Sequence, residues 1–157
     1  VMNAFYMACS SFISQNLGAQ KKERVTKSYF ICLAYSFGAG AVLGLSLVLF
    51  GRQFLTLFTT DEAVRQAGMA RLRVMGFSYM VSALMDNTIA ASRGIGKSLV
   101  PTIIVIMGSC VFRVVWVYTV FAYFHTIDSL YLLYVFSWTI TAAAEIAYFA
   151  ASYKKLW

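Results

Sequence analysis

Residues 29–50 read YFICLAYSFGAGAVLGLSLVLF and contain no charged side chain over 22 positions. A helix of about 20 apolar residues crosses the hydrocarbon core of a bilayer, so this stretch predicts a transmembrane helix. Within it, Ser36, Gly40 and Gly44 recur at every fourth position. This spacing puts small side chains along one stripe of the helix, which allows a neighbouring helix to pack closely against it.

The composition of the whole chain also indicates a lipid environment. Of the 157 residues, 61% are hydrophobic and 12% are charged, whereas soluble domains have about 45–50% and about 25%. The 13 Lys and Arg residues outnumber the 6 Asp and Glu residues, but they lie between long uncharged runs and form no continuous patch. We therefore expect the lipid bilayer as a partner and no nucleic acid.

Metal binding and disulfide bonding are not expected. The three cysteines, Cys9, Cys32 and Cys110, lie in apolar runs and show no CxxC spacing, which indicates free thiols. His125 is the one histidine of the sequence and lies between two hydrophobic runs. A histidine without partners is expected in a loop and not as a metal ligand.

Other parts of the chain predict further helices. Three more stretches are long and apolar enough to span a membrane, namely residues 74–92, 99–124 and 130–152. The apolar run at residues 1–15 is shorter than a span, so we expect the chain to begin partway along a helix and to be a fragment. The predicted fold class is therefore an all-α membrane protein with four complete transmembrane helices plus the end of a fifth.

The link between the first two complete spans differs from the others. It contains TTDEAV at 59–64, where a threonine cap followed by acidic residues is typical of a helix start. Val64, Gly68 and Leu72 then face one side, while the arginines lie elsewhere. We expect a short amphipathic helix at about 60–72, lying at the membrane interface.

The basic residues of the links predict the orientation. One side carries eight of them, and the other side carries four, which are Arg52, Arg65, Arg71 and Arg73. Cytoplasmic loops carry the excess of Lys and Arg, so the eight-charge side, with the C-terminus, is predicted to be cytoplasmic in a multi-pass protein of the plasma (inner) membrane. The eight are Lys21, Lys22, Arg24, Lys27, Arg93, Lys97, Lys154 and Lys155.

Three ionisable side chains lie well inside the predicted spans. At 1.5 Å per residue, Asp86 lies about 10 Å, Glu145 about 13 Å and Arg113 about 18 Å from the ends of their helices. Such residues are costly in lipid and normally face a partner or a water-filled cavity. Arg113 and Glu145 lie on consecutive antiparallel helices at similar depths, so we predict a structural ion pair between them.

Asp86 is the candidate for a functional group. Tyr79 and Ser82 share its helix face, and Asn87 follows it directly. This face is small and polar, as the wall of a cavity would be, so all four residues are candidates for cation coupling or for lining a cavity. The alternative is a structural carboxylate paired with Arg93 or with a neighbouring helix.

Four stretches resemble, in order, the C-terminal lobe of multidrug and toxic compound extrusion (MATE) transporters. ACSSFISQNLGAQKKERV (8–25) resembles the family's entry into a cytoplasmic loop, and LFTTDEAV (57–64) resembles its next link. MDNTIAASRGIGKSLVPTIIVIMGSCVFRVVW (85–116) resembles an Arg-Gly-x-Gly loop with the following helix, and SLYLLYVFSWTITAAAEIAYF (129–149) resembles the last helix. The residues that carry the two loop motifs are Gln15, Asn16, Gly18, Arg93, Gly94 and Gly96.

The resemblance implies a twelve-helix fold of two six-helix lobes, with this chain supplying most of one lobe and a missing N-terminal lobe of the same polypeptide as its partner. It implies export of cationic or amphipathic compounds in exchange for Na⁺ or H⁺ by alternating access, without a cofactor. Asp86 falls on the helix where family members carry an acidic residue linked to coupling. In some members that residue lies about one turn away, where this chain has Ser82.

Two other functions stay open from the sequence. One is a lipid-linked saccharide flippase of the same superfamily, and the other is a membrane module that is purely structural and does not transport. An enzyme is not expected, because the sequence contains neither an HExxH nor a GxSxG motif.

Overall fold

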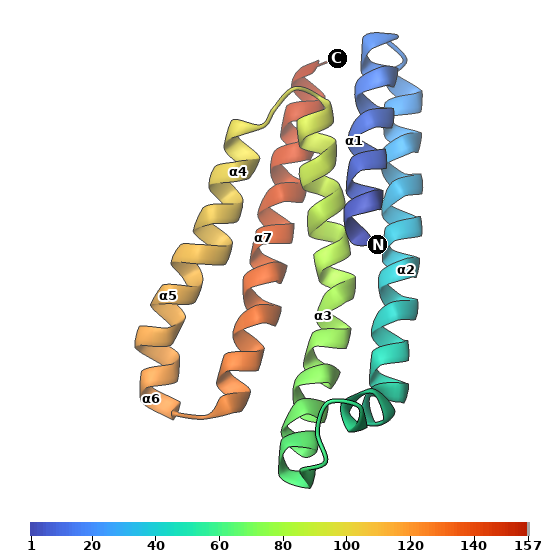
Figure 1. Ribbon diagram of the computed structural model, residues 1–157. Helices are drawn as coiled ribbons and strands as arrows, with labels where there is room; N and C mark the ends of the chain where they lie inside the picture. The colour runs from blue at the N-terminus through green and yellow to red at the C-terminus, as the bar shows by residue number, and fades with distance from the viewer. Residues whose placement is uncertain (157) are drawn as a thin grey trace.

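The computed structural model describes residues 1–156, and these residues confirm the all-α class (Figure 1). α1 (Met2–Gly18), α2 (Lys22–Thr56), α3 (Glu62–Gly94) and α7 (Ile127–Leu156) are long helices that lie side by side. Residues 99–124 form another long helix from shorter segments that follow one another without a break. These are α4 (Leu99–Val105), η1 (Ile106–Val111), α5 (Phe112–Trp116), η2 (Val117–Phe121) and α6 (Ala122–Phe124), with π-helical geometry in η1 and η2.

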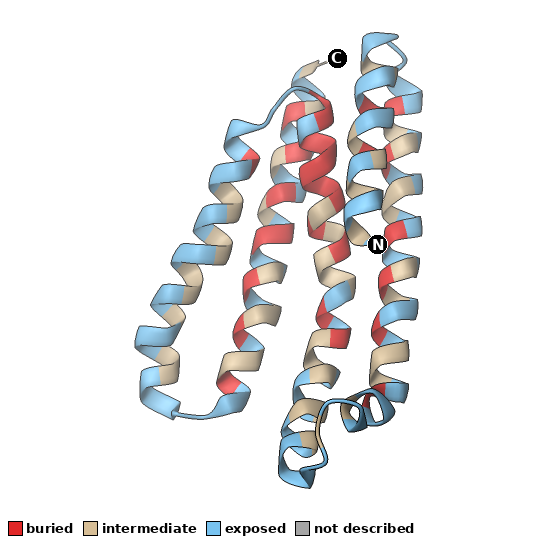
Figure 2. Cartoon of the chain, in the orientation of Figure 1, coloured by how far each residue is buried: buried red, intermediate tan, exposed pale blue. Residues whose placement is uncertain are grey.

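Within residues 1–156, three helices are long and apolar enough to cross a membrane, where the sequence predicted four complete spans. They are Lys22–Thr56, Leu99–Phe124 and Ile127–Leu156. α3 is long enough but too polar by the same criterion. The reason is its central place, because α1, α2 and α7 pack around it and bury many of its side chains (Figure 2). A helix that protein covers does not need a surface that dissolves in lipid.

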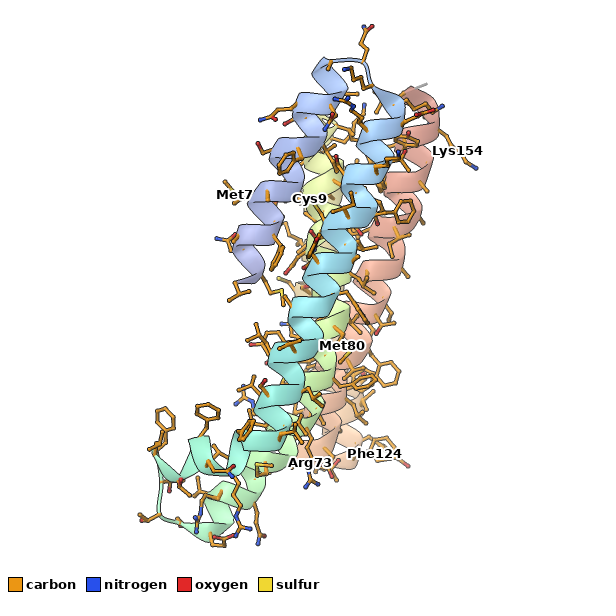
Figure 3. All side chains as sticks on the ribbon, turned by 90° about the vertical axis from the view of Figure 1, so that its right-hand side faces the viewer. Met7, Cys9, Arg73, Met80, Phe124 and Lys154 are labelled. Carbon is orange, nitrogen blue, oxygen red and sulfur yellow. The ribbon has the colours of Figure 1, made fainter. Side chains whose placement is uncertain are left out.

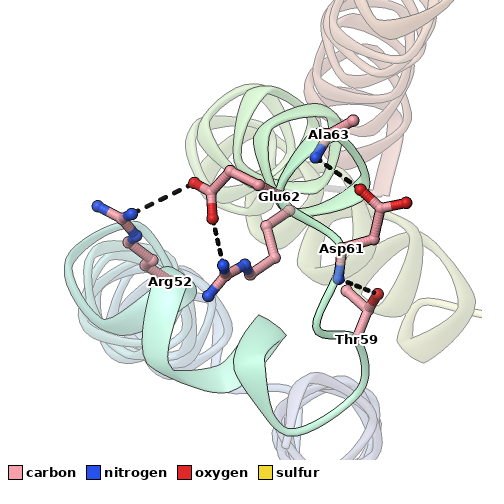
Figure 4. Close-up of polar contacts among 6 residues, drawn as sticks. Arg52, Thr59, Asp61, Glu62 and Ala63 are labelled. Carbon is pink, nitrogen blue, oxygen red and sulfur yellow. Dashed lines mark hydrogen bonds and ion pairs between the residues drawn. The ribbon is translucent and has the colours of Figure 1, made fainter.

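The first turns of α3 correct the prediction of a separate interfacial helix. Residues 60–72 belong to one helix that continues from Glu62 to Gly94. Neither glycine nor proline lies between Arg71 and Met75, so nothing interrupts the backbone hydrogen bonds there. The cap is Asp61 and not a threonine, because its carboxylate accepts a hydrogen bond from the Ala63 N–H at 2.9 Å (Figure 4).

The stripe of small residues on α2 faces α3, which confirms the predicted role in helix packing. Ser36, Gly40 and Gly44 are all buried. A Cβ atom at Gly44 would overlap the carbonyl oxygen of Gly76, and a Cβ at Gly76 would lie 2.9 Å from the carbonyl oxygen of Gly44. The two backbones therefore touch at this crossing, and only glycine fits at either position.

The main core lies at the end of the bundle where α1, α2, α3 and α7 come together. Its polar contact is the hydrogen bond at 3.0 Å between the hydroxyl groups of Tyr29 and Thr88. On α1, Cys9 is completely buried while Met7 is 63% exposed, and Figure 3 shows Met7 at the outer side of that helix. The buried residues of this core are Cys9, Ile13, Val25, Tyr29, Ala90, Ala91, Ile95 and Phe149. All three cysteines are free thiols, as predicted.

The turns follow the predictions in part. Gly96 has φ +82° and follows α3, where the Lys97 N–H donates to the Ser92 carbonyl at 3.0 Å. α1 ends at Gly18, and the residue with left-handed backbone geometry in the following turn is Gln20, at φ 56°. His125 lies in the turn before α7, which confirms its loop position.

Candidate functional site

A pocket of about 540 Å³ lies between α1, α3 and α4, and Asp86 forms part of its wall. α3 carries Asp86 and Arg93 into the pocket from two successive turns of the same face, since residues seven apart lie on one side of a helix. The remaining polar lining comes from α1 and α4. The full lining is Met2, Asn3, Tyr6, Asp86, Ile89, Arg93, Thr102, Val105 and Ile106.

Asp86 is half-buried and has a hydroxyl group as its neighbour. The Ser82 hydroxyl, one turn earlier on α3, donates to the Asp86 carboxylate at 3.5 Å. Within residues 1–156 no basic side chain lies in ion-pair distance of this carboxylate. The structural alternative, an ion pair between Asp86 and Arg93, is therefore not formed.

Arg93 is held by other groups of the same pocket. Its guanidinium donates to the Thr102 hydroxyl of α4 at 3.3 Å and lies 5.8 Å from the ring centre of Tyr6 on α1. These contacts connect α3 to both helices that close the pocket. They also place a positive charge in the pocket wall that does not neutralise Asp86 by direct contact.

Asn87 and Tyr79 do not line the pocket, although the sequence grouped them with Asp86. Asn87 is buried, its amide donates to the Ala83 carbonyl at 2.9 Å, and the Cys9 thiol donates to its main-chain carbonyl at 3.7 Å. It therefore lies inside the bundle and away from the pocket, because consecutive residues of a helix point about 100° apart. Tyr79 lies two turns before Asp86 and is 36% exposed.

The predicted ion pair between Arg113 and Glu145 is not present. Arg113 donates to the Ser137 hydroxyl at 3.3 Å, and its guanidinium lies 4.6 Å from the ring centre of Tyr134 and 6.0 Å from that of Trp138. Glu145 lies eight residues beyond Ser137, which is about 12 Å further along α7. The prediction counted how deep each residue lies from the end of its own helix, and this gave Arg113 and Glu145 similar depths in the membrane. In the structure, the register between the two packed helices separates these side chains.

Glu145 is the other carboxylate that the helices enclose. It is completely buried, and neither of its carboxylate oxygens has a hydrogen-bond partner among residues 1–156. Sequence reasoning did not predict this arrangement, because it paired the Glu145 carboxylate with Arg113.

The residues of the two loop motifs build the end of the bundle. The Asn16 amide donates to the Phe12 carbonyl at 2.7 Å and to the Ser28 hydroxyl at 3.4 Å, so it joins α1 to α2. The Gln15 amide donates to the Ser11 hydroxyl at 3.3 Å. A Cβ at Gly94 would lie 2.9 Å from the Ile13 side chain, so this glycine permits the close approach of α3 to α1.

Sequence reasoning missed three polar residues of the pocket: Asn3, Tyr6 and Thr102. Asn3 and Tyr6 are three apart in the first apolar run, so they lie on one helix face, and that spacing was a usable signal. No signal in the sequence could have identified Thr102, because its place in the pocket depends on how far α4 diverges from α3. No group of three or more His, Cys, Asp or Glu side chains within residues 1–156 is arranged to hold a metal ion.

Apolar membrane-length helices beside a central, more polar helix that carries a carboxylate into a pocket are typical of a multi-pass helical membrane protein. The sequence model of the MatE family matches residues 1–119. The chain therefore belongs to the MatE family, as the resemblance indicated. The comparison with curated proteins found no match.

Solved structures show the same fold. A multidrug resistance MATE family transporter of the MOP superfamily, in an inward-facing conformation, superposes with a TM-score of 0.86 at 19% identity, over 96% of this chain and 35% of that one. A MATE protein in complex with MaL6 gives 0.85 at 19% identity, over 96% and 34%. An outward-facing conformation gives 0.84 at 19% identity, again over 96% and 34%. The chain thus spans about a third of the length of these transporters.

Proposed function

We propose that this chain is part of an antiporter that exports cationic or amphipathic compounds in exchange for Na⁺ or H⁺ by alternating access. The observation that carries the proposal is the Asp86 carboxylate, which lines a pocket of about 540 Å³ without a cationic partner at ion-pair distance. Membership of the MatE family supports it. So does the likeness in fold to multidrug resistance transporters.

The chemistry of the pocket suits an exchange. A carboxylate in a medium of low dielectric constant is stabilised either by a proton or by a bound cation, so the two compete for it. The Ser82 hydroxyl can donate to the carboxylate or offer its lone pairs to a cation. Release of the coupling ion then accompanies binding of a cationic compound, which links the two fluxes.

The remaining lining suits amphipathic compounds. Apolar side chains such as Ile89 and Ile106 alternate with the ring of Tyr6, and ligand pockets combine such surfaces with few polar groups. Arg93 is the one basic residue of the pocket, and Arg113 is engaged with Tyr134. This lining favours a cationic cargo over the phosphorylated cargo of a saccharide flippase, which would require several basic residues.

The same proposal includes the place of the chain in the whole protein. We assign it to the C-terminal lobe, with an N-terminal lobe completing the transport pathway and with the C-terminus in the cytoplasm. The basic residues at the two ends of the bundle support this orientation, and Figure 3 shows Lys154 at one end with Arg73 and Phe124 at the other. Accessibility labelling of a single cysteine placed at Lys154 tests the orientation.

The decisive experiment uses the full-length gene in cells that lack their own drug exporters. We expect Asp86→Asn to abolish drug resistance while the protein reaches the membrane in normal amount, and Asp86→Glu to retain part of it. The matched control is Asp128→Asn, which removes an exposed carboxylate in the first turn of α7. Wild-type efflux by the Asp86→Asn protein would reject the coupling role.

A further inference from the structure

A second pocket lies at the opposite end of the bundle, where α2 meets the first turns of α3. Its volume is about 450 Å³, and its polar lining is mostly cationic. Arg52 comes from α2, whereas Glu62, Arg65, Gln66 and Arg73 come from one face of α3. None of these residues belongs to the proposed transport pocket.

Glu62 neutralises only part of this positive charge. One of its carboxylate oxygens pairs with Arg52 at 3.2 Å and the other pairs with Arg65 (Figure 4). Arg73 forms no ion pair or hydrogen bond with any residue of 1–156. Three guanidinium groups and one carboxylate leave the pocket with a net charge of +2.

The pocket also contains a buried donor that lacks an acceptor. The Nε–H of Arg65 is buried and makes no hydrogen bond within the described chain. Buried N–H groups in proteins are normally paired, and an isolated one indicates a missing acceptor. An oxyanion between the guanidinium groups of Arg65 and Arg73 would balance the charge, since such groups bind phosphate oxygens in bidentate fashion.

The position of the pocket identifies the source of the oxyanion. Arg52 comes two residues after the uncharged run 29–50, and Arg73 directly precedes the uncharged stretch 74–85. Both arginines therefore lie where the helices leave the hydrocarbon, at the level of the lipid headgroups. At the adjoining turn, Leu57 is 79% exposed and Phe58 is 85% exposed, so this end of the bundle also presents apolar side chains.

We propose that this pocket, formed by Arg52, Arg65 and Arg73 around Glu62, binds the phosphate group of an anionic phospholipid. A net negative headgroup such as phosphatidylglycerol suits the +2 charge better than a zwitterionic one. Glu62 orients Arg52 and Arg65, and Arg73 supplies a guanidinium that no other side chain of the described chain engages.

The test is the binding of phosphatidylglycerol to the purified full-length transporter, followed by native mass spectrometry and by the melting temperature. We expect phosphatidylglycerol to bind and raise the melting temperature, and the Arg73→Gln variant to bind it about tenfold more weakly. Arg73→Gln breaks no ion pair, so the fold is retained. The matched control is Arg71→Gln, which removes the same charge from an exposed position of α3 outside the pocket.

Each remaining outcome overturns the proposal. If Arg71→Gln weakened the binding of phosphatidylglycerol as much as Arg73→Gln does, the surface would attract anions in general and the pocket would not be a specific site. Inorganic phosphate that raises the melting temperature as much as the lipid would identify a free anion as the ligand. Equal binding of phosphatidylcholine and phosphatidylglycerol would show that the pocket does not select negative headgroups.

Discussion

Gly44 offers the sharpest test of how α2 and α3 pack. Replacing it by alanine puts a methyl group against the backbone of Gly76, where the Cβ would lie 3.1 Å from the carbonyl carbon and closer still to the carbonyl oxygen. A backbone cannot rotate away as a flexible side chain can, so the helices must separate. Overpacking of this kind costs about 1–3 kcal/mol, and we expect a value near the upper end.

The same substitution also has a favourable part. Alanine in a helix interior is about 1 kcal/mol more favourable than glycine, so the net loss for Gly44→Ala is about 2 kcal/mol. Gly38 is the matched control, because it lies on the exposed side of the same helix with no atom within 4 Å of its Cβ position. Gly38→Ala should therefore raise stability by up to about 1 kcal/mol.

The assay is the melting temperature of the full-length protein in detergent. A difference of about 3 kcal/mol between the two variants corresponds to roughly 3 °C, because the shift per kcal/mol falls as the chain lengthens and the full transporters are about three times as long as this chain. Equal melting temperatures for Gly44→Ala and Gly38→Ala would refute the backbone contact between α2 and α3.

Two further predictions concern a pair of turns and the half-buried Arg113. Gly96→Ala should lower the free energy of unfolding by about 1 kcal/mol and Gln20→Gly should raise it by a similar amount, because both positions have left-handed backbone geometry; shifts of the melting temperature in the same direction would contradict this. A double-mutant cycle by thermal unfolding should give a coupling energy of about 0.5–1 kcal/mol between Arg113 and Tyr134. The coupling between Arg113 and Glu145 should stay below about 0.5 kcal/mol, and a larger value would restore the ion pair.

The helices and their close packing could be predicted because the signals are local. An uncharged run of 22 residues and the spacing of Ser36, Gly40 and Gly44 describe one helix at a time. Asp86 could be singled out for the same reason, since a carboxylate within an apolar span has few uses that are not functional.

The contacts between helices could not be predicted, because they depend on register. Whether Arg113 meets Glu145 or Ser137 is decided by how far one helix slides along the other, and one turn of 5.4 Å changes the partner. The predicted start of α3 was wrong for a related reason. Polar residues at 60–72 predicted a helix on the membrane surface, whereas the uninterrupted backbone and the Asp61 cap make them the first turns of the long central helix α3.

The unbroken course of α3 has a mechanical consequence. At 1.5 Å per residue, its 33 residues extend about 50 Å, whereas the hydrocarbon core is about 30 Å thick. One continuous helix therefore contributes to both pockets, with the arginine pocket near its first turns and the Asp86 pocket toward its last turns. In the exchange that we propose for Asp86, a tilt of α3 would move Arg65 and Arg73 relative to the lipid headgroups, so lipid bound at the arginine pocket would change the free energy of that tilt.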